Sequence, residues 1–463
     1  MGAAFSRGWE TRSLREVVTK LVDGSHNPPP KQETGLPMLS ARNIDRSQVL
    51  FDVYRLISES SFVSENARTR IAAGDVLLTI VGTIGRTAVV PEGVQPFSLQ
   101  RSVAVLTPAK NLLPKFLCYQ LQSPAIQKHF EANARGTAQK GVYLKTLGQT
   151  PIVLPPLDVQ TEIVAEIEKQ FSRLDEAVAN LQRVKANLKR YKASVLKDAV
   201  EGRLVPTEAE LARREGCSFE TGEQLLQRIL EARKVDWAGR GKYEEPPAVE
   251  SVGLAELPNG WVWASAEQIS TFITKGTTPA AQKLLEGVGD VQFLKVYNLT
   301  FDGTLNHTYK PAFVSRATHE GELLRSGVLA GDVLINIVGP PLGQVSVVPA
   351  MMAEANMNQA IARYRPIKPL STKFVAHALM TESIMTWAIR KAKTTAGQTN
   401  LTLDLCRRLP IPLPPLAEQE RIVAEVDRRL SLILGVQTEV DLNLKRSLVL
   451  RGAVLQRAFS ECA

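Results

Sequence analysis

Pro151–Glu168 has the sequence PIVLPPLDVQTEIVAEIE, and Pro410–Asp427 has the sequence PIPLPPLAEQERIVAEVD. Eleven of these eighteen positions are identical, at a constant spacing of 259 residues. Such similarity within one chain indicates an internal duplication. Each copy opens with an apolar segment that ends in two prolines and continues into a run without proline, where a helix can begin.

The duplication extends upstream of this stretch. Ala73–Gly82 (AGDVLLTIVG) matches Ala330–Gly339 (AGDVLINIVG), and Gly8-Trp9 matches Gly260-Trp261. The duplicated unit is therefore roughly 200 residues long, which is a domain pair and not a solenoid repeat. By contrast, residues 23–62 and 274–313 hardly match. A retained frame with divergent loops predicts two copies that do the same job on different targets.

Within each copy, the first part is predicted to be a compact α+β domain of about 150 residues. Apolar, β-branched runs bounded by glycine predict strands, and longer mixed segments predict helices. The expected strands are 76–81, 103–106, 333–338 and 361–364, and the expected helical segments are 114–132 and 372–393.

The second part of each copy is predicted to be one long helix with a heptad pattern of apolar residues. The seam positions are Ile167, Leu174, Leu181, Leu188 and Val195 in the first copy, and Val426, Ile433, Val440 and Val454 in the second. Roughly forty residues at 1.5 Å each give a rod of about 60 Å. We expect the two helices to form an antiparallel coiled coil, which would relate the α+β domains by a pseudo-two-fold axis. Two separate amphipathic helices on globular cores are the alternative.

These patterns predict five segments along the chain. They are a first α+β domain (1–156), a first long helix (157–204), a helical and proline-rich linker (205–257), a second α+β domain (258–415) and a second long helix (416–463). Within the linker, 222–233 is expected to be a charged helix, and 239–247 has the Gly- and Pro-containing composition of a flexible connection.

Composition favours a polyanionic partner. Among 463 residues, 56 Lys and Arg against 47 Asp and Glu give a formal net charge of +9 and a pI of about 9.3. Neutralising phosphates releases counterions, so a basic surface suits nucleic acid. No apolar run approaches the ~20 residues needed to span a bilayer. The four cysteines (Cys118, Cys217, Cys406 and Cys462) form no C-x-x-C pair, and a reducing cytoplasm fits them best.

Motifs for catalysis and metal binding are missing from the sequence. It has no Walker A loop, no G-x-G-x-x-G after a strand and no H-E-x-x-H, and its five histidines are scattered. Asn27-Pro28-Pro29-Pro30 is similar to the Asn-Pro-Pro-Tyr/Phe motif of DNA amino-methyltransferases. The fourth residue here is Pro30, which cannot stack on a flipped base as an aromatic ring does. We therefore expect no catalytic residues and no metal ligands in this chain.

Over essentially its whole length, the chain resembles the specificity subunits of type I restriction–modification systems. The resemblance depends on Gly-Trp at each unit start, the Gly-Asp-Val-Leu strand, the Pro-Ile-x-Leu-Pro-Pro-Leu-x-x-Gln-x-x-Ile-Val stretch and the repeated helix. The linker Gly-Lys-Tyr-Glu-Glu-Pro-Pro, with the later Leu-Pro-Asn-Gly-Trp, resembles the A subgroup of that family.

The resemblance implies a non-catalytic, sequence-specific DNA-binding subunit. Each recognition domain would read one half of a bipartite site in double-stranded DNA, and the paired helices would set the spacing. Two methyltransferase subunits and two restriction subunits would dock on the chain in the cytoplasm. S-adenosylmethionine, ATP and Mg²⁺ would belong to those partners, which would methylate adenine N6 and cleave DNA. A coiled-coil adaptor without DNA affinity and a self-sufficient methyltransferase or nuclease are the competing hypotheses.

In the family, DNA contacts lie on loops of the recognition domains, and polar side chains on such loops can reach base edges or phosphates. Each of these loops could also be an ordinary turn, because Gly, Asn, Ser and Thr dominate turns. In the first copy the candidates are Ser25, His26, Arg42, Asn43, Thr83, Arg86, Gln100, Arg101, Thr137, Gln139 and Lys140. In the second copy they are Lys275, Thr277, Thr278, Lys295, Asn298, Gln344, Asn358, Gln359, Thr395, Gln398 and Asn400.

Overall fold

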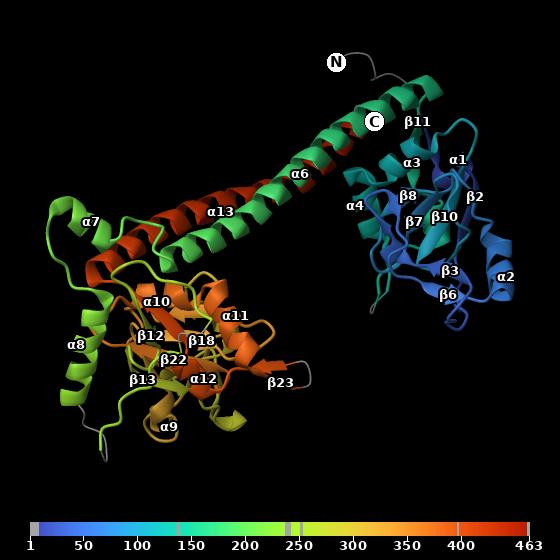
Figure 1. Cartoon of the computed structure of the whole chain (residues 1–463). Helices are drawn as coiled ribbons and strands as arrows, with labels where there is room; N and C mark the ends of the chain where they lie inside the picture. Colours follow the sequence, from blue (N-terminus) through green and yellow to red (C-terminus); the bar gives the residue numbers. More distant parts are fainter. Residues whose placement is uncertain (1–8, 137–138, 237–241, 251–252, 396–397, 461–463) are drawn as a thin grey trace. The chain divides into compact units, whose positions relative to one another are not determined.

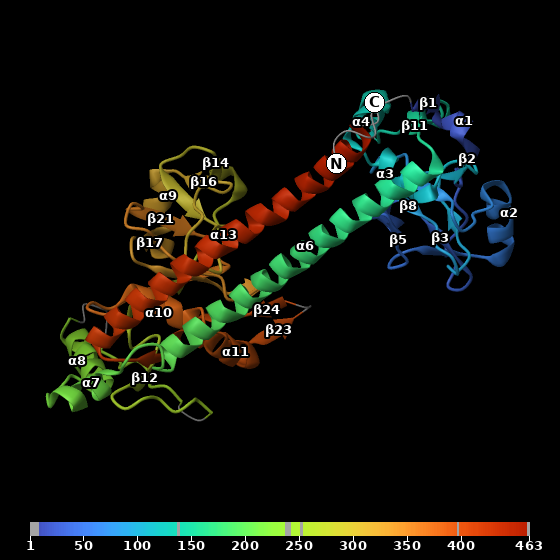
Figure 2. The same cartoon turned by 90° about the horizontal axis from the view of Figure 1, so that it is seen from above.

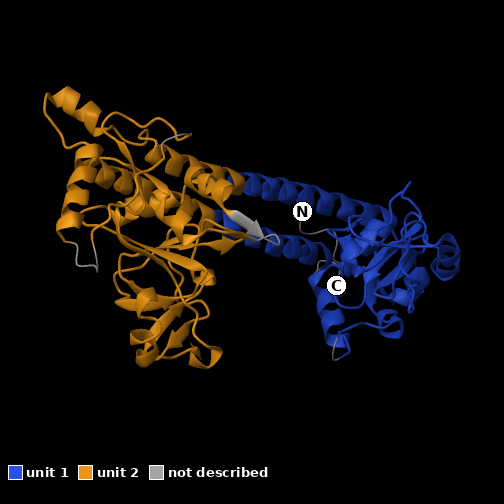
Figure 3. Ribbon diagram, turned by 60° about the horizontal axis from the view of Figure 1, so that its bottom comes forward, with its two compact units in different colours: residues 1–184, 439–463 blue, residues 185–438 orange. Residues whose placement is uncertain are grey.

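The computed structural model describes residues 9–136, 139–236, 242–250, 253–395 and 398–460. It divides into two compact units, shown in Figure 3: unit 1 is Met1–Val184 with Glu439–Ala463, and unit 2 is Lys185–Thr438. The two long helices, α6 (Leu157–Val200) and α13 (Leu416–Ser460), are each divided between the units. Over the described ranges, no helix is both long and apolar enough to cross a membrane.

Unit 1 is a mixed domain whose centre is a four-stranded antiparallel sheet in the order β2-β10-β7-β8 (Figure 1). Its strands are β1 (Glu10–Ser13), β2 (Val18–Asp23), β3 (Leu36–Leu39), β4 (Ile44–Asp45), β5 (Gln48–Val49), β6 (Arg55–Ile57), β7 (Val76–Thr79), β8 (Thr87–Val89), β9 (Ser98–Leu99), β10 (Val103–Pro108) and β11 (Pro151–Leu154). Its helices before α6 are α1 (Leu14–Val17), η1 (Ala41–Asn43), α2 (Glu59–Thr69), α3 (Pro114–Leu121), α4 (Pro124–Asn133) and α5 (Leu144–Leu147).

Unit 2 repeats this plan with a second four-stranded sheet in the order β13-β22-β18-β20. Its strands are β12 (Val262–Ser265), β13 (Ser270–Lys275), β14 (Leu285–Glu286), β15 (Val291–Leu294), β16 (Ala312–Val314), β17 (Gly327–Leu329), β18 (Val333–Asn336), β19 (Val338–Gly339), β20 (Val345–Val347), β21 (Glu354–Met357), β22 (Ile361–Pro366), β23 (Lys393–Thr395), β24 (Gln398–Asn400) and β25 (Pro410–Leu413). Its helices between α6 and α13 are α7 (Glu208–Glu215), α8 (Gly222–Val235), η2 (Ala281–Lys283), η3 (Val296–Asn298), α9 (Arg316–Glu320), η4 (Leu324–Ser326), α10 (Thr372–Leu379), α11 (Glu382–Lys391) and α12 (Leu403–Arg407).

A second sheet lies beside the central one in each unit. In unit 1 it has the order β6-β3-β9, and in unit 2 it has the order β14-β16-β15-β21-β17, seen beside α9 in Figure 2. Within these sheets, β3 pairs parallel with β9, and β15 pairs parallel with β21. The same central order and the same parallel pair in both units confirm the predicted α+β class of each domain.

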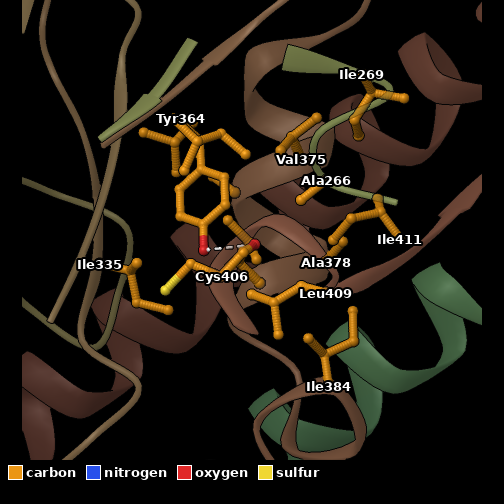
Figure 4. Packing of buried hydrophobic residues seen from close by; sticks show 14 of the residues in the cluster. Ala266, Ile269, Ile335, Tyr364, Val375, Ala378, Ile384, Cys406, Leu409 and Ile411 are labelled. Atoms are coloured by element: carbon orange, nitrogen blue, oxygen red, sulfur yellow. Dashed lines mark hydrogen bonds between the residues drawn. The ribbon is translucent and has the colours of Figure 1, made fainter. Parts of the chain in front are cut away.

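Each central sheet separates two apolar clusters, because strand side chains alternate between its faces. In unit 2, the cluster toward α10, α11 and α12 surrounds Tyr364, which has no exposed surface (Figure 4). The Tyr364 hydroxyl donates a hydrogen bond to the backbone oxygen of Cys406 over 3.2 Å. Burial raises the pKa of the Cys406 thiol to about 11, so this cysteine is a protonated core residue and not a ligand or nucleophile.

The aspartate of the Gly-Asp-Val-Leu motif is buried in both units and pairs with a cation on another strand of the central sheet. In unit 1, Asp75 accepts hydrogen bonds from the Ala72 amide at 2.9 Å and from Lys20 at 2.8 Å. In unit 2, Asp332 accepts two hydrogen bonds from the Arg365 guanidinium, both at 2.7 Å. The repeated motif therefore has a structural role, since it closes the turn before β7 or β18 and ties that strand to the sheet.

The glutamine of the duplicated stretch anchors the start of each long helix. Gln160 is fully buried. Its side-chain oxygen accepts from the Leu113 backbone amide at 2.8 Å, and its side-chain nitrogen donates to the backbone oxygens of Asn111 and Pro155 at 2.9 and 2.8 Å. In unit 2, Gln419 accepts from the Ser371 amide at 3.1 Å and donates to the Pro414 oxygen at 2.9 Å.

Within each unit, one long helix packs against the opposite end of the other. In unit 1, Ile167 and Phe171 of α6 share a core with Leu455 and Phe459 of α13. In unit 2, Val195 and Leu196 near the end of α6 share a core with Ile422 and Val426 near the start of α13. The heptad residues are all buried or half-buried: Ile167, Leu174, Leu181, Val440 and Val454 in unit 1, and Leu188, Val195, Val426 and Ile433 in unit 2.

The linker folds onto unit 2. Its charged helix, expected over 222–233, is α8 (Gly222–Val235), whose Leu225 and Ile229 pack into the core beside β12 and β25. Sequence reasoning did not identify α7, although Thr207 and Glu210 form a capping box that marks its start. Glu418 is buried here and accepts hydrogen bonds from the Trp261 indole at 3.0 Å and the Glu208 amide at 2.9 Å.

Candidate nucleic-acid interface

Five loops of unit 1 meet at one edge of the domain, where backbone hydrogen bonds join them. The Ser25 amide at the end of β2 donates to the Leu99 oxygen at 2.7 Å, and the Gln100 amide donates to the Leu39 oxygen at 2.9 Å. Gly24 is required for this approach, because a Cβ atom there would lie 2.2 Å from the Leu99 oxygen.

The same network continues to the remaining loops of unit 1. The amide of Ile80 donates to the Ser102 oxygen at 2.9 Å, and the amide of Gly82 donates to the Lys140 oxygen at 3.0 Å. The amide of Ala41 donates to the Ser102 hydroxyl at 3.1 Å. We call this set loop edge 1; it comprises residues 24–27, 41–43, 82–86, 100–102, 135–136 and 139–140.

Unit 2 builds an equivalent surface on the same backbone frame. The Thr277 amide donates to the Met357 oxygen at 3.1 Å, and the Asn358 amide donates to the Leu294 oxygen at 3.0 Å. Gly276 repeats the role of Gly24, since a Cβ there would lie 2.1 Å from the Asn358 oxygen. We call this set loop edge 2; it comprises residues 275–278, 295–298, 342–344, 358–360, 393–395 and 398–400.

Loop edge 1 is rich in exposed basic side chains. His26, Arg42, Arg86, Arg101 and Lys140 are exposed. Two of them have acidic neighbours: His26 Nε2 lies 2.8 Å from an Asp23 carboxylate oxygen, and Arg86 lies 3.4 Å from the Asp45 carboxylate. The neutral candidates Thr83 and Gln139 are exposed, and Ser25 and Gln100 are half-buried. Thr137 lies outside the described residues. The structure thus gathers ten of the eleven candidates in this unit.

Outside residues 393–398, loop edge 2 carries fewer exposed charges than loop edge 1 and more amides. Lys275, Thr278 and Gln359 are exposed, and the Thr278 hydroxyl donates to the Gln359 side chain. Gln344 and Asn358 are half-buried. The Gln344 amide donates to the Leu299 oxygen at 2.9 Å. The Asn358 side-chain oxygen is buried and has no hydrogen-bond partner among the described residues.

The candidates Thr395, Gln398 and Asn400 lie on a two-stranded ribbon in loop edge 2. Strands β23 and β24 pair antiparallel, with Thr395 opposite Gln398, and β24 also pairs with β19. The corresponding loop of unit 1 is shorter, and its described residues form isolated bridges, of which one joins Arg135 and Gly141. A two-stranded ribbon fits the major groove of B-form DNA.

Two candidates do not face solvent. Asn43 and Asn298 are each only 2% exposed. Asn43 donates to the backbone oxygens of Leu50 and Val53 at 2.9 and 3.0 Å, and Asn298 donates to those of Asn306 and Tyr309, both at 2.9 Å. The expectation that these two asparagines contact DNA is therefore wrong: each holds its own loop together from the inside.

Sequence reasoning also missed an exposed aromatic cluster next to Lys295, formed by Tyr297 and Tyr309. Tyrosine is not a typical turn residue, so the sequence pattern that identified the loop candidates did not include these two. The only sequence signal for them is that they lie close to Lys295 and Lys310 along the chain. No group of three or more His, Cys, Asp or Glu side chains that could hold a metal ion occurs within the described ranges.

Comparison with known proteins adds a family to this geometry. The model of the type I restriction modification DNA specificity domain matches residues 6–190 and again 258–433. The two matches together cover more than half of the chain and fall on the two copies of the repeat.

Curated relatives and a solved structure agree. The specificity subunit of type I restriction enzyme EcoBI from Escherichia coli is 27% identical over 50% of this chain, a match that spans about half, 49%, of that relative's length. The EcoDI specificity subunit, also from Escherichia coli, is 21% identical over 97% of this chain and 88% of its own. A chain from a structural study of type I R-M system assembly and conformational transition aligns over 98% of both chains, with a TM-score of 0.65 and 21% identity; it has a similar fold.

Proposed function

Because the chain belongs to the family defined by the type I restriction–modification DNA specificity domain, we propose that it reads the two halves of one split DNA site. Unit 1 reads one half-site with loop edge 1, and unit 2 reads the other half-site with loop edge 2. The chain itself is non-catalytic.

One observation carries this proposal: the two loop edges share a backbone frame but present different side chains. The Ser25–Leu99 and Thr277–Met357 hydrogen bonds are equivalent, as are the Gln100–Leu39 and Asn358–Leu294 hydrogen bonds. On that frame, Arg101 in unit 1 corresponds to Gln359 in unit 2. Arginine pairs with guanine and glutamine pairs with adenine in the major groove. Equivalent positions with different readout chemistry are expected of two readers of different half-sites.

The long helices are proposed to form an antiparallel coiled coil that spaces the two readers. Contacts inside each unit support this arrangement. Arg451 of α13 pairs with Asp175 of α6 over 2.6 Å, and its guanidinium lies 4.1 Å from the centre of the Phe171 ring. In unit 2, Ile422 and Val426 of α13 have no exposed surface beside α6. Helices that contact at opposite ends run antiparallel.

The proposal includes the partners implied by the family. Two methyltransferase subunits and two restriction subunits would assemble on this chain in the cytoplasm. Those partners would carry S-adenosylmethionine, ATP and Mg²⁺, methylate adenine N6 and cleave DNA. The chain would supply target choice alone, which accords with its lack of a catalytic motif.

The test is sequence-specific DNA binding by the full chain. Methylome sequencing of cells that express the chain with its methyltransferase identifies the site. Binding of a duplex with that site and of a scrambled duplex is then measured from 50 to 200 mM KCl. We expect a steep loss of affinity with salt and a preference of at least about a thousandfold for the site. Equal affinity for both duplexes would instead favour an adaptor without sequence specificity.

Variants assign the half-sites. Arg101→Ala should weaken discrimination only in the half-site read by unit 1, and Gln359→Ala should do so only in the other, each by about 1–3 kcal/mol. Lys110→Ala and Lys368→Ala are matched controls. Both lysines are exposed and follow β10 or β22, at the ends of these strands opposite the loop edges. If Arg101→Ala changed both half-sites equally, the assignment of one unit to each half would be wrong.

A further inference from the structure

A cluster of two tyrosines and two lysines lies partly within loop edge 2, which contributes Lys295 and Tyr297; Tyr309 and Lys310 complete it. The Tyr297 and Tyr309 rings are perpendicular neighbours, with centroids 5.7 Å apart and an interplanar angle of 88°. They are 38% and 48% exposed. Lys295 Nζ lies 5.9 Å from the Tyr297 ring centroid, and Lys310 Nζ lies 5.4 Å from that of Tyr309. Both ammonium groups are therefore within cation–π range of a tyrosine face.

The cluster is held from both sides. From the inside, the buried side-chain amide of Asn298 donates to the backbone oxygen of Tyr309, and the backbone amide of Lys295 donates to the side-chain oxygen of Asn298 at 2.9 Å. From the outside, the Tyr297 hydroxyl donates to the Lys310 backbone oxygen at 3.0 Å. These contacts fix the two ends of segment 295–310 together, so the lysines project from a rigid base.

Neither Lys295 nor Lys310 has an ion pair within the described residues. The acidic residue of this segment, Asp302, is held by the Thr300 and Thr304 hydroxyls; burial raises its pKa, but hydrogen bonds from Thr300 and Thr304 and the nearby Lys192 lower it below the usual range on balance. Two cations that no carboxylate neutralises form a site for an anion. The cluster adjoins Asn358 of loop edge 2, since the Asn358 amide bonds to the oxygen of Leu294.

This arrangement favours phosphate over a base as the ligand. Because a lysine already lies over each tyrosine, an unstacked base would have to displace an ammonium group in order to stack there. The lysine ammonium groups, in contrast, remain free to donate. Phosphate contacts from lysine position a protein on DNA without reading its sequence.

Building on the proposed function, we propose that Lys295 and Lys310 bind phosphates of the DNA backbone beside the second half-site, and that Tyr297 and Tyr309 hold these ammonium groups in place. Among the described residues of unit 1, no lysine lies over a tyrosine ring in this way. At its equivalent positions, judged by the Asn43 contacts, Arg42 replaces Tyr297 and the exposed Val53 replaces Tyr309. Under this proposal, different side chains contact the DNA backbone beside each of the two half-sites.

The salt dependence of binding tests the lysines. The full chain carrying Lys295→Gln and Lys310→Gln is compared with wild type and with Lys368→Gln, on a 40-base-pair duplex with the site and on a scrambled duplex. The slope of log K against log salt should be shallower by about 0.9 for each lysine and by about 1.8 for both. Affinity should fall by a similar factor on both duplexes, because phosphates carry no sequence information. A slope equal to that of Lys368→Gln would overturn the proposal.

The tyrosines are tested without any change of charge. Tyr297→Leu combined with Tyr309→Leu should lower affinity although both lysines remain, whereas Tyr309→Phe should bind as wild type does because the ring is kept. Wild-type affinity of the double leucine variant would remove the positioning role. If the wild-type chain did not distinguish the two duplexes, the proposed function would fail; if it did and the lysine variants kept wild-type slopes, only this inference would fail.

Discussion

At the scale of single residues, the duplication identifies side chains that hold the frame. A polar residue that makes the same buried contacts in both copies is structural, whatever its loop composition indicates. Asn43 and Asn298 show this most clearly, because the side chain of each donates hydrogen bonds to two backbone carbonyl groups of its own loop. Sequence alone could not separate them from exposed loop asparagines, since burial is set by the chain folding around them.

The first prediction concerns Asn43. Asn43→Ala leaves the Leu50 and Val53 carbonyl groups without their donor, and a buried unpaired group costs about 1–3 kcal/mol. We expect faster amide hydrogen exchange across residues 40–54, measured by mass spectrometry on the full chain. Asn27→Ala is the control, because Asn27 is exposed. Unchanged exchange in the Asn43 variant would show that its two hydrogen bonds contribute little.

The second prediction concerns His377, where unit 1 has Tyr119. Burial lowers the pKa of His377 to about 4; Asp427, 3.7 Å away, raises it, and Lys373 and Lys192 lower it further. Unfolded histidine titrates near 6.5. Between about pH 6.5 and pH 4 the unfolded chain binds more protons, so stability falls as pH falls, by on the order of 3 kcal/mol in total.

His377→Tyr should flatten this pH dependence, because tyrosine stays neutral throughout that range. Urea unfolding followed by tryptophan fluorescence reports mainly on unit 2, which holds four of the five tryptophans. Lys373→Met should reduce the slope partially, since it removes one nearby cation. Identical pH profiles for wild type and His377→Tyr would contradict the buried, neutral state of this histidine.

At the scale of elements, regular patterns could be predicted and their interruptions could not. The long helices expected over 157–204 and 416–463 are α6, which ends at Val200, and α13, which ends at Ser460. The helix expected over 114–132 is two helices, because Pro124 starts α4 after a turn at Gln122–Ser123. The regular spacing of hydrophobic residues indicates where a helix lies, but the ends of the helix depend on capping and on tertiary contacts.

The third prediction concerns the junction between α6 and its domain. Gln160→Ala removes three buried hydrogen bonds, to Leu113, Asn111 and Pro155. We expect the first turns of α6 to exchange amide hydrogens at least tenfold faster, while the sheet of unit 1 stays protected. Glu162→Ala, two positions along on the exposed side of the helix, should have no such effect. Equal exchange rates in both variants would mean that apolar packing alone holds the start of α6 in place.

At the scale of the whole molecule, the resemblance of the repeated motifs to a known family predicted the class of protein, but it did not predict the target sequence. The frame of each unit is encoded by repeated residues such as Gly24 and Gly276, whereas the loop edges diverge. Because the loop edges differ between the two copies, comparing the copies does not show which of their side chains face solvent. Only the folded structure shows this. Lys310 and its tyrosine partners became visible as a group only when residues 295–310 were brought together in space.

The fourth prediction concerns the spacing of the half-sites. Inserting one heptad into α6 between Leu181 and Leu188, and another into α13 between Ile433 and Val440, lengthens a paired rod by about 10.5 Å. The gap between half-sites should grow by about three base pairs, at 3.4 Å per base pair, with both half-site sequences unchanged. Methylome sequencing reads both quantities. A changed half-site sequence, or a wild-type gap in a folded double insertion, would count against the ruler.

The order in which the chain leaves the ribosome gives the divided helices a further meaning. Unit 2 is one continuous stretch, whereas unit 1 joins the first 184 residues to the last 25. Phe459 lies against Phe116 with ring centroids 5.4 Å apart, so unit 1 obtains part of its interior from residues that are synthesised after all of unit 2. Removing residues 439–463 would thus damage the core of unit 1 and leave the core of unit 2 intact.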